Sequence, residues 1–515
     1  MANGWANYRS PLSHKGLSED PLLQIQSFPL RSFQCCIVAV CLTSLAALVG
    51  CSGKAASETK AEPRIEKPKP PTAVPMWLGN GERNFFGTGP WKDGELKVVW
   101  EVETGFIGGR LHKDPWGGTS WPGQPSIKDN RVYFPSADGN VYCLDKDDGT
   151  VIWKFKAKDS FKATPVILED KILASGLDHH LYCINSKDGS LIWDYQAGFE
   201  IDGSTIVRDG RIYFGCEDHN FYCLNLADGS LVYKVPVGSV EGSITMKDGR
   251  VYLGTEGGDL YCINPADGST IWKARIGADS DSTPAVAHGF VYTAAEDGVV
   301  RAYKADTGEL AWTFVTDGAR LYAGDEHRGI WASPILVDGK IYIGASNHYL
   351  YCLSADKGEL VWKYKAHGPI WGTSPVVAGR VVFGDKAGWI NMLDADDGKL
   401  ISELRIGENI NSTPAILDGR IYIGAFNGKL YCLGMEPKTE GEDQTPDVIK
   451  QKADGGMQKA GGRRQKKHPI PDTLKPIPET RNPAPATLPL TPETRKPTPD
   501  SRQPTFDTRA HASHR

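Results

Sequence analysis

The chain has 515 residues, 40% of them hydrophobic and 23% charged, which is the composition of an ordinary globular protein. Its formal net charge is -5 and its pI is about 6.2. Nucleic-acid-binding proteins usually present a concentrated basic face, so this charge argues against a nucleic-acid partner.

An apolar, uncharged stretch runs from Phe33 to Gly50, just after Arg31. Its length suits the hydrophobic part of a signal peptide or a marginal membrane span. It ends in Leu48-Val49-Gly50-Cys51, which resembles the lipobox of bacterial lipoproteins. The resemblance implies that residues 1–50 are a leader and that Cys51 carries a diacylglycerol. An uncleaved anchor is the alternative.

The residues on either side of this stretch qualify the prediction. The segment before Phe33 is long for a signal peptide and contains Glu19 and Asp20, which leaves open whether Met1 is the true start. Ser52, rather than Asp, follows Cys51, and the resemblance to lipoproteins then implies sorting to the outer membrane. Residues 51–76 are rich in Lys, Glu, Pro and Ala, which predicts a flexible tether.

From residue 77 to 434 the chain repeats one unit, seen most clearly from Val141 to Trp153. The steps between successive units are 40, 40, 39, 40, 50, 40 and 40 residues, and such a period is the signature of a repeat architecture. Eight units are predicted. Their equivalent positions are Cys143, Cys183, Cys223, Cys262, Ala302, Cys352, Met392 and Cys432.

Each unit is predicted to form four short strands, because β-branched and aromatic residues alternate with turns of Gly, Asp and Asn. In the second unit these strands, A to D, are expected at Ala163 to Leu168, Lys171 to Ser175, Leu181 to Asn185 and Ser190 to Tyr195. Four-stranded sheets at this spacing are the blades of a β-propeller, so an all-β, eight-bladed propeller of antiparallel blades is the predicted fold.

The D strand of most units carries an aromatic residue four positions after a turn glycine, and we predict that these rings pack between adjacent blades. They are Trp153, Trp193, Tyr233, Trp272, Trp312 and Trp362. The last unit lacks a D strand, whereas Leu96 to Val102, with Trp100, precedes the first A strand and resembles a D strand. We therefore predict that this N-terminal strand completes the last blade and closes the ring.

Six of the eleven cysteines occupy the same repeat position. Equivalent atoms on neighbouring sheets lie roughly 10 Å apart, whereas a disulfide needs Cα atoms within about 7 Å. We therefore predict that these cysteines are small buried residues rather than disulfides or metal ligands.

The turn glycine and tryptophan, following a strand such as Leu181-Tyr182-Cys183, resemble the pyrroloquinoline-quinone (PQQ) repeat. This repeat is known from quinoprotein alcohol dehydrogenases and from BamB-like lipoproteins, and the resemblance covers Trp77 to Leu433. It implies a propeller, and it leaves the function open between an enzyme and a scaffold.

Residues 435–515 lose the apolar periodicity. They contain a basic run, Arg463 to His468, followed by a degenerate seven-residue repeat that begins at Pro469. Recurrent proline without core-forming residues predicts a disordered, proline-rich tail. Contact of this tail with the cell wall or an anionic surface is the alternative.

Connections from strand D to strand A meet at one end of a propeller channel, so residues just before strand A should form a ring. These are Pro122, Lys162, Asp202, Glu241, Asp281, Trp331, Trp371 and Asn411. We predict that this asymmetric ring binds a cation, a basic segment of a partner or a ligand stacked on an indole. Charges that are merely solvated are the alternative.

Two longer connections, Thr104 to Trp121 and Thr316 to Trp331, add candidate binding residues, because long loops on a rigid ring often carry function. The candidates are Trp116, Trp121, Arg320, His327 and Arg328. Asp279 joins them, since Asp279-x-Asp281 followed by Ser282-Thr283-Pro284 resembles an acidic pair in BamB-like propellers.

We therefore expect a non-enzymatic, lipid-anchored, monomeric scaffold on the periplasmic side of the bacterial envelope. The resemblance implies periplasmic or outer-membrane protein partners and a BamB-like role in outer-membrane protein assembly, with no catalytic residue, metal or cofactor. The alternative is a PQQ- and Ca²⁺-dependent dehydrogenase or a small-ligand-binding propeller. Asp202, Glu241 and Asp281 belong to separate units, which argues against their sharing one Ca²⁺.

Overall fold

The computed structural model describes residues 73–107, 116–117, 123–317, 329–407 and 409–437. The predicted leader, nearly all of the tether and nearly all of the tail lie outside the described residues, so those boundaries stay predictions. Among the described residues, no helix has the length and apolar character needed to cross a membrane.

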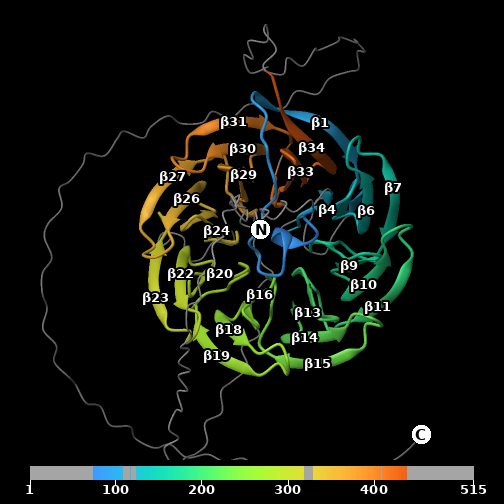
Figure 1. Ribbon diagram of the computed structural model, residues 1–515, viewed down its shortest axis with the longest axis vertical. Helices are drawn as coiled ribbons and strands as arrows, with labels where there is room; N and C mark the ends of the chain where they lie inside the picture. The colour runs from blue at the N-terminus through green and yellow to red at the C-terminus, as the bar shows by residue number, and fades with distance from the viewer. Residues whose placement is uncertain (1–72, 108–115, 118–122, 318–328, 408, 438–515) are drawn as a thin grey trace, which may run out of the picture. The chain divides into compact units, whose positions relative to one another are not determined.

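Eight four-stranded antiparallel sheets surround a central axis, which confirms the predicted eight-bladed propeller (Figure 1). The strands of blades 1 to 4 are, in chain order, β4 (Ser126–Lys128), β5 (Arg131–Pro135), β6 (Asn140–Asp145), β7 (Val151–Lys156); β8 (Val166–Ile167), β9 (Lys171–Ser175), β10 (His180–Asn185), β11 (Leu191–Gln196); β12 (Ile206–Arg208), β13 (Arg211–Cys216), β14 (Asn220–Asn225), β15 (Leu231–Pro236); β16 (Thr245–Lys247), β17 (Arg250–Gly254), β18 (Asp259–Ile263), β19 (Thr270–Arg275).

Blades 5 to 7 repeat the same order, and blade 8 combines three C-terminal strands with the first long strand of the chain. Their strands are β20 (Ala285–Ala287), β21 (Phe290–Ala294), β22 (Val299–Lys304), β23 (Leu310–Val315); β24 (Ile335–Val337), β25 (Lys340–Gly344), β26 (Tyr349–Ser354), β27 (Leu360–Lys365); β28 (Val376–Val377), β29 (Arg380–Gly384), β30 (Trp389–Asp394), β31 (Leu400–Arg405); β32 (Ala415–Leu417), β33 (Arg420–Ala425), β34 (Lys429–Glu436) and β1 (Glu95–Glu103).

The ring is closed by β1, as predicted. This strand pairs antiparallel with β34 from Glu95 opposite Glu436 to Glu103 opposite Lys429. The order of blade 8 is β1-β34-β33-β32, so the N-terminal strand is its outermost strand. Blade 8 is therefore held together by the two ends of the propeller sequence.

The predicted aromatic residues lie at the interfaces between blades. The ring of Trp153 lies against Gly189 of the next blade, where an added Cβ would come within 2.7 Å of the indole. Gly189 has a φ of +77°, which also favours glycine. The same contact joins Trp100 to Gly149, Trp193 to Gly229, Tyr233 to Gly268, Trp272 to Gly308, Trp312 to Gly358 and Trp362 to Gly398.

The repeated cysteine lies between two large rings. Cys143 is opposite Tyr133 on one neighbouring strand and Trp153 on the other, and the centroids of those rings are 5.8 Å apart. A β-bulge follows the cysteine in the pairing with the outer strand. All six cysteines of this position are buried and free, as predicted, and burial raises the pKa of the Cys143 thiol to about 11. A small side chain is what this space accepts.

The innermost strands are shorter than expected, and the residues before them link the blades. Strand A of blade 2, predicted from Ala163, consists of Val166–Ile167 alone. Pro165 has no amide hydrogen, and the Thr164 amide donates sideways to Ser204 Oγ at 2.9 Å. The corresponding amide-to-hydroxyl bonds join Gln124 to Thr164, Ser204 to Ser243, Thr283 to Ser333, Ser333 to Thr373 and Thr373 to Thr413.

Residues 73–94, which we call the plug, run across one end of the channel and include the short helix η1 (Trp77–Gly79). Their centre is Arg83, which is 3% exposed. Its guanidinium donates to the carbonyls of Trp77 at 2.7 Å, Ile244 at 3.0 Å and Ser204 at 3.2 Å, with a longer bond to Thr205 at 3.4 Å. One side chain thus binds the plug to blades 3 and 4.

Candidate binding site

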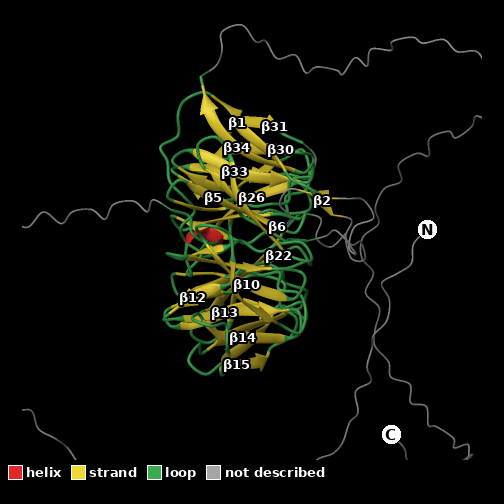
Figure 2. Ribbon diagram, turned by 90° about the vertical axis from the view of Figure 1, so that its right-hand side faces the viewer, coloured by secondary structure: helices red, strands yellow, loops and turns green. Residues whose placement is uncertain are grey.

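The plug lies at one end of the channel, and turns and connections of the blades lie at the other. The plug contacts the ends of the innermost strands, where Gly87 bridges to Ile416 and Thr88 Oγ1 bonds to Asp418. The turns between the second and third strands and the connections into each blade lie at the opposite end. Figure 2 shows η1 and β2 (Phe106–Ile107) on opposite faces of the ring. The predicted ring of residues belongs to the face opposite the plug.

In blades 2 to 8 three residues meet on this face, because a backbone hydrogen bond ties the connection into the blade to the turn after the second strand. In blade 3 the Glu217 amide donates to the Glu200 carbonyl at 3.2 Å, and in blade 5 the Glu296 amide donates to the Asp279 carbonyl at 3.0 Å. The predicted ring residue lies two positions after the connection residue, as Asp202 follows Glu200. Each of these seven blades therefore presents a connection, a ring and a turn residue.

Carboxylates occupy most of these positions in blades 3 to 5, and we call them the acidic arc. Its members are Glu200, Asp202 and Glu217 of blade 3, Glu241 and Glu256 of blade 4, and Asp279, Asp281 and Glu296 of blade 5.

A lysine from blade 2 pairs with the arc. The Lys162 ammonium forms ion pairs with Asp202 and, at 3.5 Å, with Glu241, and its side chain is 12% exposed. Burial alone would lower the pKa of Lys162, but Asp202 and Glu241 raise it above its usual value. The lysine therefore stays charged at neutral pH and neutralises only part of the arc.

The carboxylates of the arc repel one another in a partly buried setting. Burial, with the charges of Asp202 and Glu241, raises the pKa of Glu217 to about 9. Burial raises the pKa of Glu241 to about 7, although Lys162 acts in the opposite direction. Burial and the charge of Glu241 also raise the pKa of Asp281 well above its ordinary value. An incoming cation would relieve this repulsion.

Aromatic residues occupy the same face in blades 6 and 7. The indoles of Trp331 and Trp371 stack with centroids 4.5 Å apart and planes 15° apart. Lys386, the turn residue of blade 7, places its ammonium 3.2 Å from the centroid of the Trp371 ring. Burial lowers the pKa of Lys386 to about 8. The next ring residue, Asn411, is 4% exposed.

Two models of known protein families match parts of the propeller sequence. The family model described as the β-propeller of the β-alanine-activating enzyme matches residues 169–435, more than half of the chain. The chain belongs to this β-propeller family. A second model, described as outer membrane protein assembly factor BamB, matches residues 93–243 and supports the PQQ-repeat character of the propeller. No curated protein matches the sequence.

Solved structures share the propeller fold at low sequence identity. A europium-containing methanol dehydrogenase has a TM-score of 0.59 at 12% identity, covering 71% of this chain and 98% of its own. The quinohemoprotein alcohol dehydrogenase of Comamonas testosteroni has a TM-score of 0.58 at 12% identity, covering 72% and 82%. The computationally designed Ika8 protein has a TM-score of 0.53 at 15% identity, covering 67% and 100%. At these identities the likeness extends to the fold alone.

The stacked indoles of blades 6 and 7 fit a quinone poorly. A flat cofactor needs an uncovered aromatic face, and Trp371 has the Trp331 indole against it and the Lys386 ammonium close over its ring. Trp371 is 7% exposed. The two indoles would have to separate before a third ring could enter between them, so the stacked pair does not form a quinone site.

The structure brings the predicted residues together in two groups. Lys162, Asp202 and Glu241 form ion pairs, with Asp281 close enough to Glu241 for their charges to interact, and Trp331 stacks on Trp371. Asp279 lies at the outer, exposed edge of the arc. The backbone of Trp116 lies in β3 (Trp116–Gly117), which pairs with β2. Cys51, Pro122, Trp121, Arg320, His327 and Arg328 lie outside the described residues.

The turn position was missed by the sequence interpretation, although a signal for it exists. Its members follow the repeat period and are Ala137, Leu177, Glu217, Glu256, Glu296, Ser346, Lys386 and Phe426. Three consecutive glutamates there coincide with the three acidic ring residues. Alignment of the repeats at this turn position would have added three carboxylates to the predicted acidic residues.

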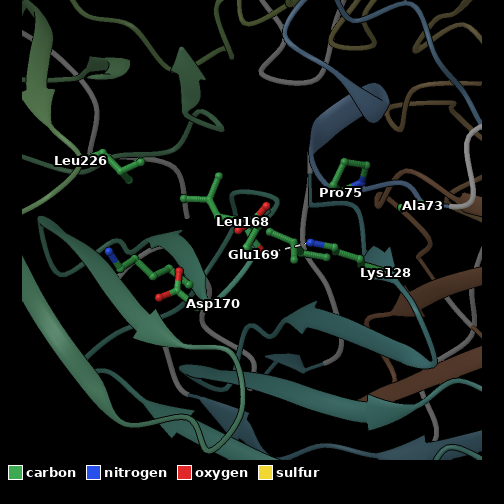
Figure 3. A pocket seen from close by; sticks show the side chains of 9 residues that line it. Ala73, Pro75, Lys128, Leu168, Glu169, Asp170 and Leu226 are labelled. Atoms are coloured by element: carbon green, nitrogen blue, oxygen red, sulfur yellow. Dashed lines mark hydrogen bonds between the residues drawn. The ribbon is translucent and has the colours of Figure 1, made fainter. Parts of the chain in front are cut away.

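A hollow on the plug face is a weaker candidate (Figure 3). It has a volume of about 500 Å³ and lies where Ala73 and Pro75 meet blades 1 and 2. Lys128 at its edge already donates to the Leu168 carbonyl at 3.2 Å. The hollow is open and has few convergent polar groups, so the acidic arc is the better candidate site.

Glu296→Gln is expected to stabilise the propeller at pH 8 but not at pH 5. Burial and the charges of Asp279 and Glu256 raise the pKa of Glu296 to about 7, from an ordinary value of 4.5. The folded state binds this proton more tightly than the unfolded state, so stability falls as pH rises through that window. We expect a Tm roughly 2 °C higher at pH 8. Differential scanning calorimetry of Glu296→Gln, with the exposed Glu169→Gln as control, tests this; equal shifts at both pH values would contradict it.

Proposed function

We propose that the propeller is a non-enzymatic scaffold of the bacterial cell envelope that binds a basic segment of a partner protein through the acidic arc. The observation that supports this most is the clustering of eight carboxylates on blades 3 to 5, partly balanced by Lys162. Such a surface attracts Lys- and Arg-rich segments and selects against acidic ones.

The envelope location and the partner class are further parts of this proposal. The lipobox-like end of the leader supports a lipid on Cys51, on the periplasmic side and more consistently at the outer membrane than the inner. The match of residues 93–243 to the BamB model supports a partner among periplasmic or outer-membrane proteins and a role in outer-membrane protein assembly. We propose that the propeller acts as a monomer.

Site-specific photo-crosslinking in intact envelopes tests this function. A crosslinker at Phe199, which is exposed beside the arc, should capture a partner through a basic segment, and one at Glu169, on the plug face, should not. The reversals Glu256→Lys and Asp279→Lys together should reduce capture at Phe199 about tenfold, because like charges would then meet. Glu169→Lys is the matched control. Equal capture on both faces, or capture that survives the reversals, would contradict the proposal.

The resemblance of the repeat to the PQQ repeat leaves a PQQ- and Ca²⁺-dependent dehydrogenase as the second candidate. Incubation of the purified protein with PQQ and Ca²⁺ separates the two. Under the scaffold proposal neither quinone absorbance nor dye-linked alcohol oxidation should appear. Appearance of both signals would replace the scaffold by an enzyme.

A further inference from the structure

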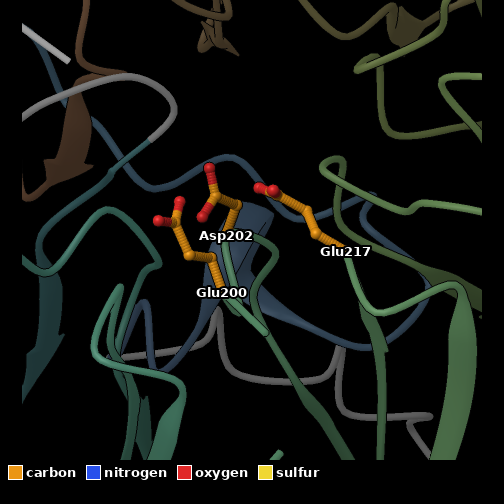
Figure 4. Close-up of side chains that lie close together, drawn as sticks. All are labelled: Glu200, Asp202 and Glu217. Atoms are coloured by element: carbon orange, nitrogen blue, oxygen red, sulfur yellow. The ribbon is translucent and has the colours of Figure 1, made fainter. Parts of the chain in front are cut away.

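Three carboxylates of blade 3 converge more closely than the rest of the acidic arc. Glu200, Asp202 and Glu217 each place an oxygen so that the three atoms lie within 4.8 Å of one another. Figure 4 shows the Asp202 carboxylate between those of Glu200 and Glu217. The cluster belongs to one blade, so its geometry does not depend on the fit between blades.

The backbone fixes the two segments that carry the cluster. The Glu217 amide donates to the Glu200 carbonyl at 3.2 Å, and the Cys216 thiol lies 3.3 Å from the same oxygen. Cys216 is fully buried at the end of β13. The carboxylates are therefore held near one another by the chain itself and cannot separate by simple backbone motion.

A second observation concerns Asp202 alone. Its side chain is fully buried, and Lys162 binds one of its oxygens, Oδ2. The other oxygen, Oδ1, is buried and accepts no hydrogen bond within the described part of the chain. Buried carboxylate oxygens nearly always have a donor or a cation, since an unsatisfied one costs free energy. This oxygen therefore lacks a positive partner.

The local charge has the same implication. The single ammonium of Lys162 pairs with both Asp202 and Glu241, and Glu217 adds a third carboxyl group close to them. One lysine does not balance these three groups, whereas a divalent cation would bring two further positive charges.

We propose that Glu200, Asp202 and Glu217 bind one divalent metal ion, with Ca²⁺ preferred. All three ligands are carboxylate oxygens, which suit hard cations. Oxygens on opposite sides of one Ca²⁺ lie about 4.8 Å apart, given bonds of about 2.4 Å. Ca²⁺ accepts irregular coordination completed by water, whereas Mg²⁺ demands a tighter octahedron. The site is complete within blade 3 and uses no quinone.

Calorimetric titration of the chelator-treated full chain with CaCl2, and separately with MgCl2, tests this site. We expect one equivalent of Ca²⁺ to bind, more tightly than Mg²⁺, and to raise Tm by a few degrees. Glu217→Gln should bind Ca²⁺ at least tenfold more weakly. Glu169→Gln, at an exposed position on the plug face, should bind it like the parent protein. Glu256→Gln, the same turn position in blade 4, should weaken binding less than Glu217→Gln does.

Folding of the variant can be judged separately from binding. Glu217→Gln removes one charge from a repulsive cluster, so its metal-free Tm should equal or exceed that of the parent. Absence of Ca²⁺ binding to the parent would overturn the proposal. Equal weakening by Glu217→Gln and Glu256→Gln would also overturn it, because diffuse attraction would then explain the binding. Metal alone is the probe, so this outcome is independent of the partner capture that tests the scaffold function.

Discussion

Replacement of β1 by a flexible linker of equal length is expected to open the ring and to destabilise the propeller more than any single substitution. The linker would remove the outermost strand of blade 8, including Leu96 at 3% exposure and Trp100 at 9%. Loss of two such side chains, together with the strand pairing, should lower the free energy of unfolding by at least about 5 kcal/mol. Hydrogen exchange should then become fastest in β33 and β34.

The matched control changes the solvent-facing side of the same strand. Val98 and Val99 are 43% and 38% exposed, so Val98→Ser and Val99→Ser should leave exchange in β33 and β34 nearly unchanged. If the linker variant kept full protection from Arg420 to Leu433, β1 would not be the element that closes the ring.

Arg83→Met is expected to release the plug. Burial lowers the pKa of Arg83 to about 9, which still leaves the guanidinium charged at pH 7. Its charge is compensated by carbonyls of Trp77, Ile244, Ser204 and Thr205. Methionine fills a similar space but leaves these acceptors without donors, so urea unfolding should show a loss of about 3 kcal/mol or more.

Two further variants separate the role of Arg83 from general sensitivity of the plug. Arg83→Lys should recover only part of the loss, because an ammonium cannot direct donors along the fixed fork of a guanidinium. Asn84→Ala, at the exposed neighbouring position, should change stability by no more than about 0.5 kcal/mol. A loss for Asn84→Ala as large as that for Arg83→Met would mean that the plug is merely fragile.

The architecture could be predicted from the sequence because each repeat carries the same interface. Trp153, the ring that packs on Gly189, follows Gly149 by four residues, and both residues recur in the repeat. The repeat period therefore also identifies the contact between neighbouring blades. The closure of the ring could be predicted because the last repeat lacks a D strand, whereas Leu96 to Val102, ahead of the first repeat, resembles one. The burial of the cysteines could be predicted because they occupy one fixed position of the repeat.

The site could be predicted only in part. The ring of residues that includes Asp202 and Glu241 could be predicted from the repeat, because each member lies just before strand A. Glu217, which lies beside Asp202, and Lys386, which lies over the Trp371 ring, come from another turn and reach these positions only through the meander of each blade. Arg83 lies in a segment outside the repeat, and its four carbonyl partners are backbone atoms. No residue pattern could reveal these acceptors.

One interface between blades departs from the pattern. Where blade 7 meets blade 8, Ser402 replaces the aromatic residue, and its hydroxyl accepts the Leu96 amide at 2.9 Å. If all contacts between blades were identical, any blade could pack beside any other. The contact between Ser402 and Leu96 differs from the seven ring-to-glycine contacts, so it favours packing of blade 7 beside blade 8 over packing beside another blade. Errors of blade order or exchange of blades between two chains would therefore be disfavoured at this place.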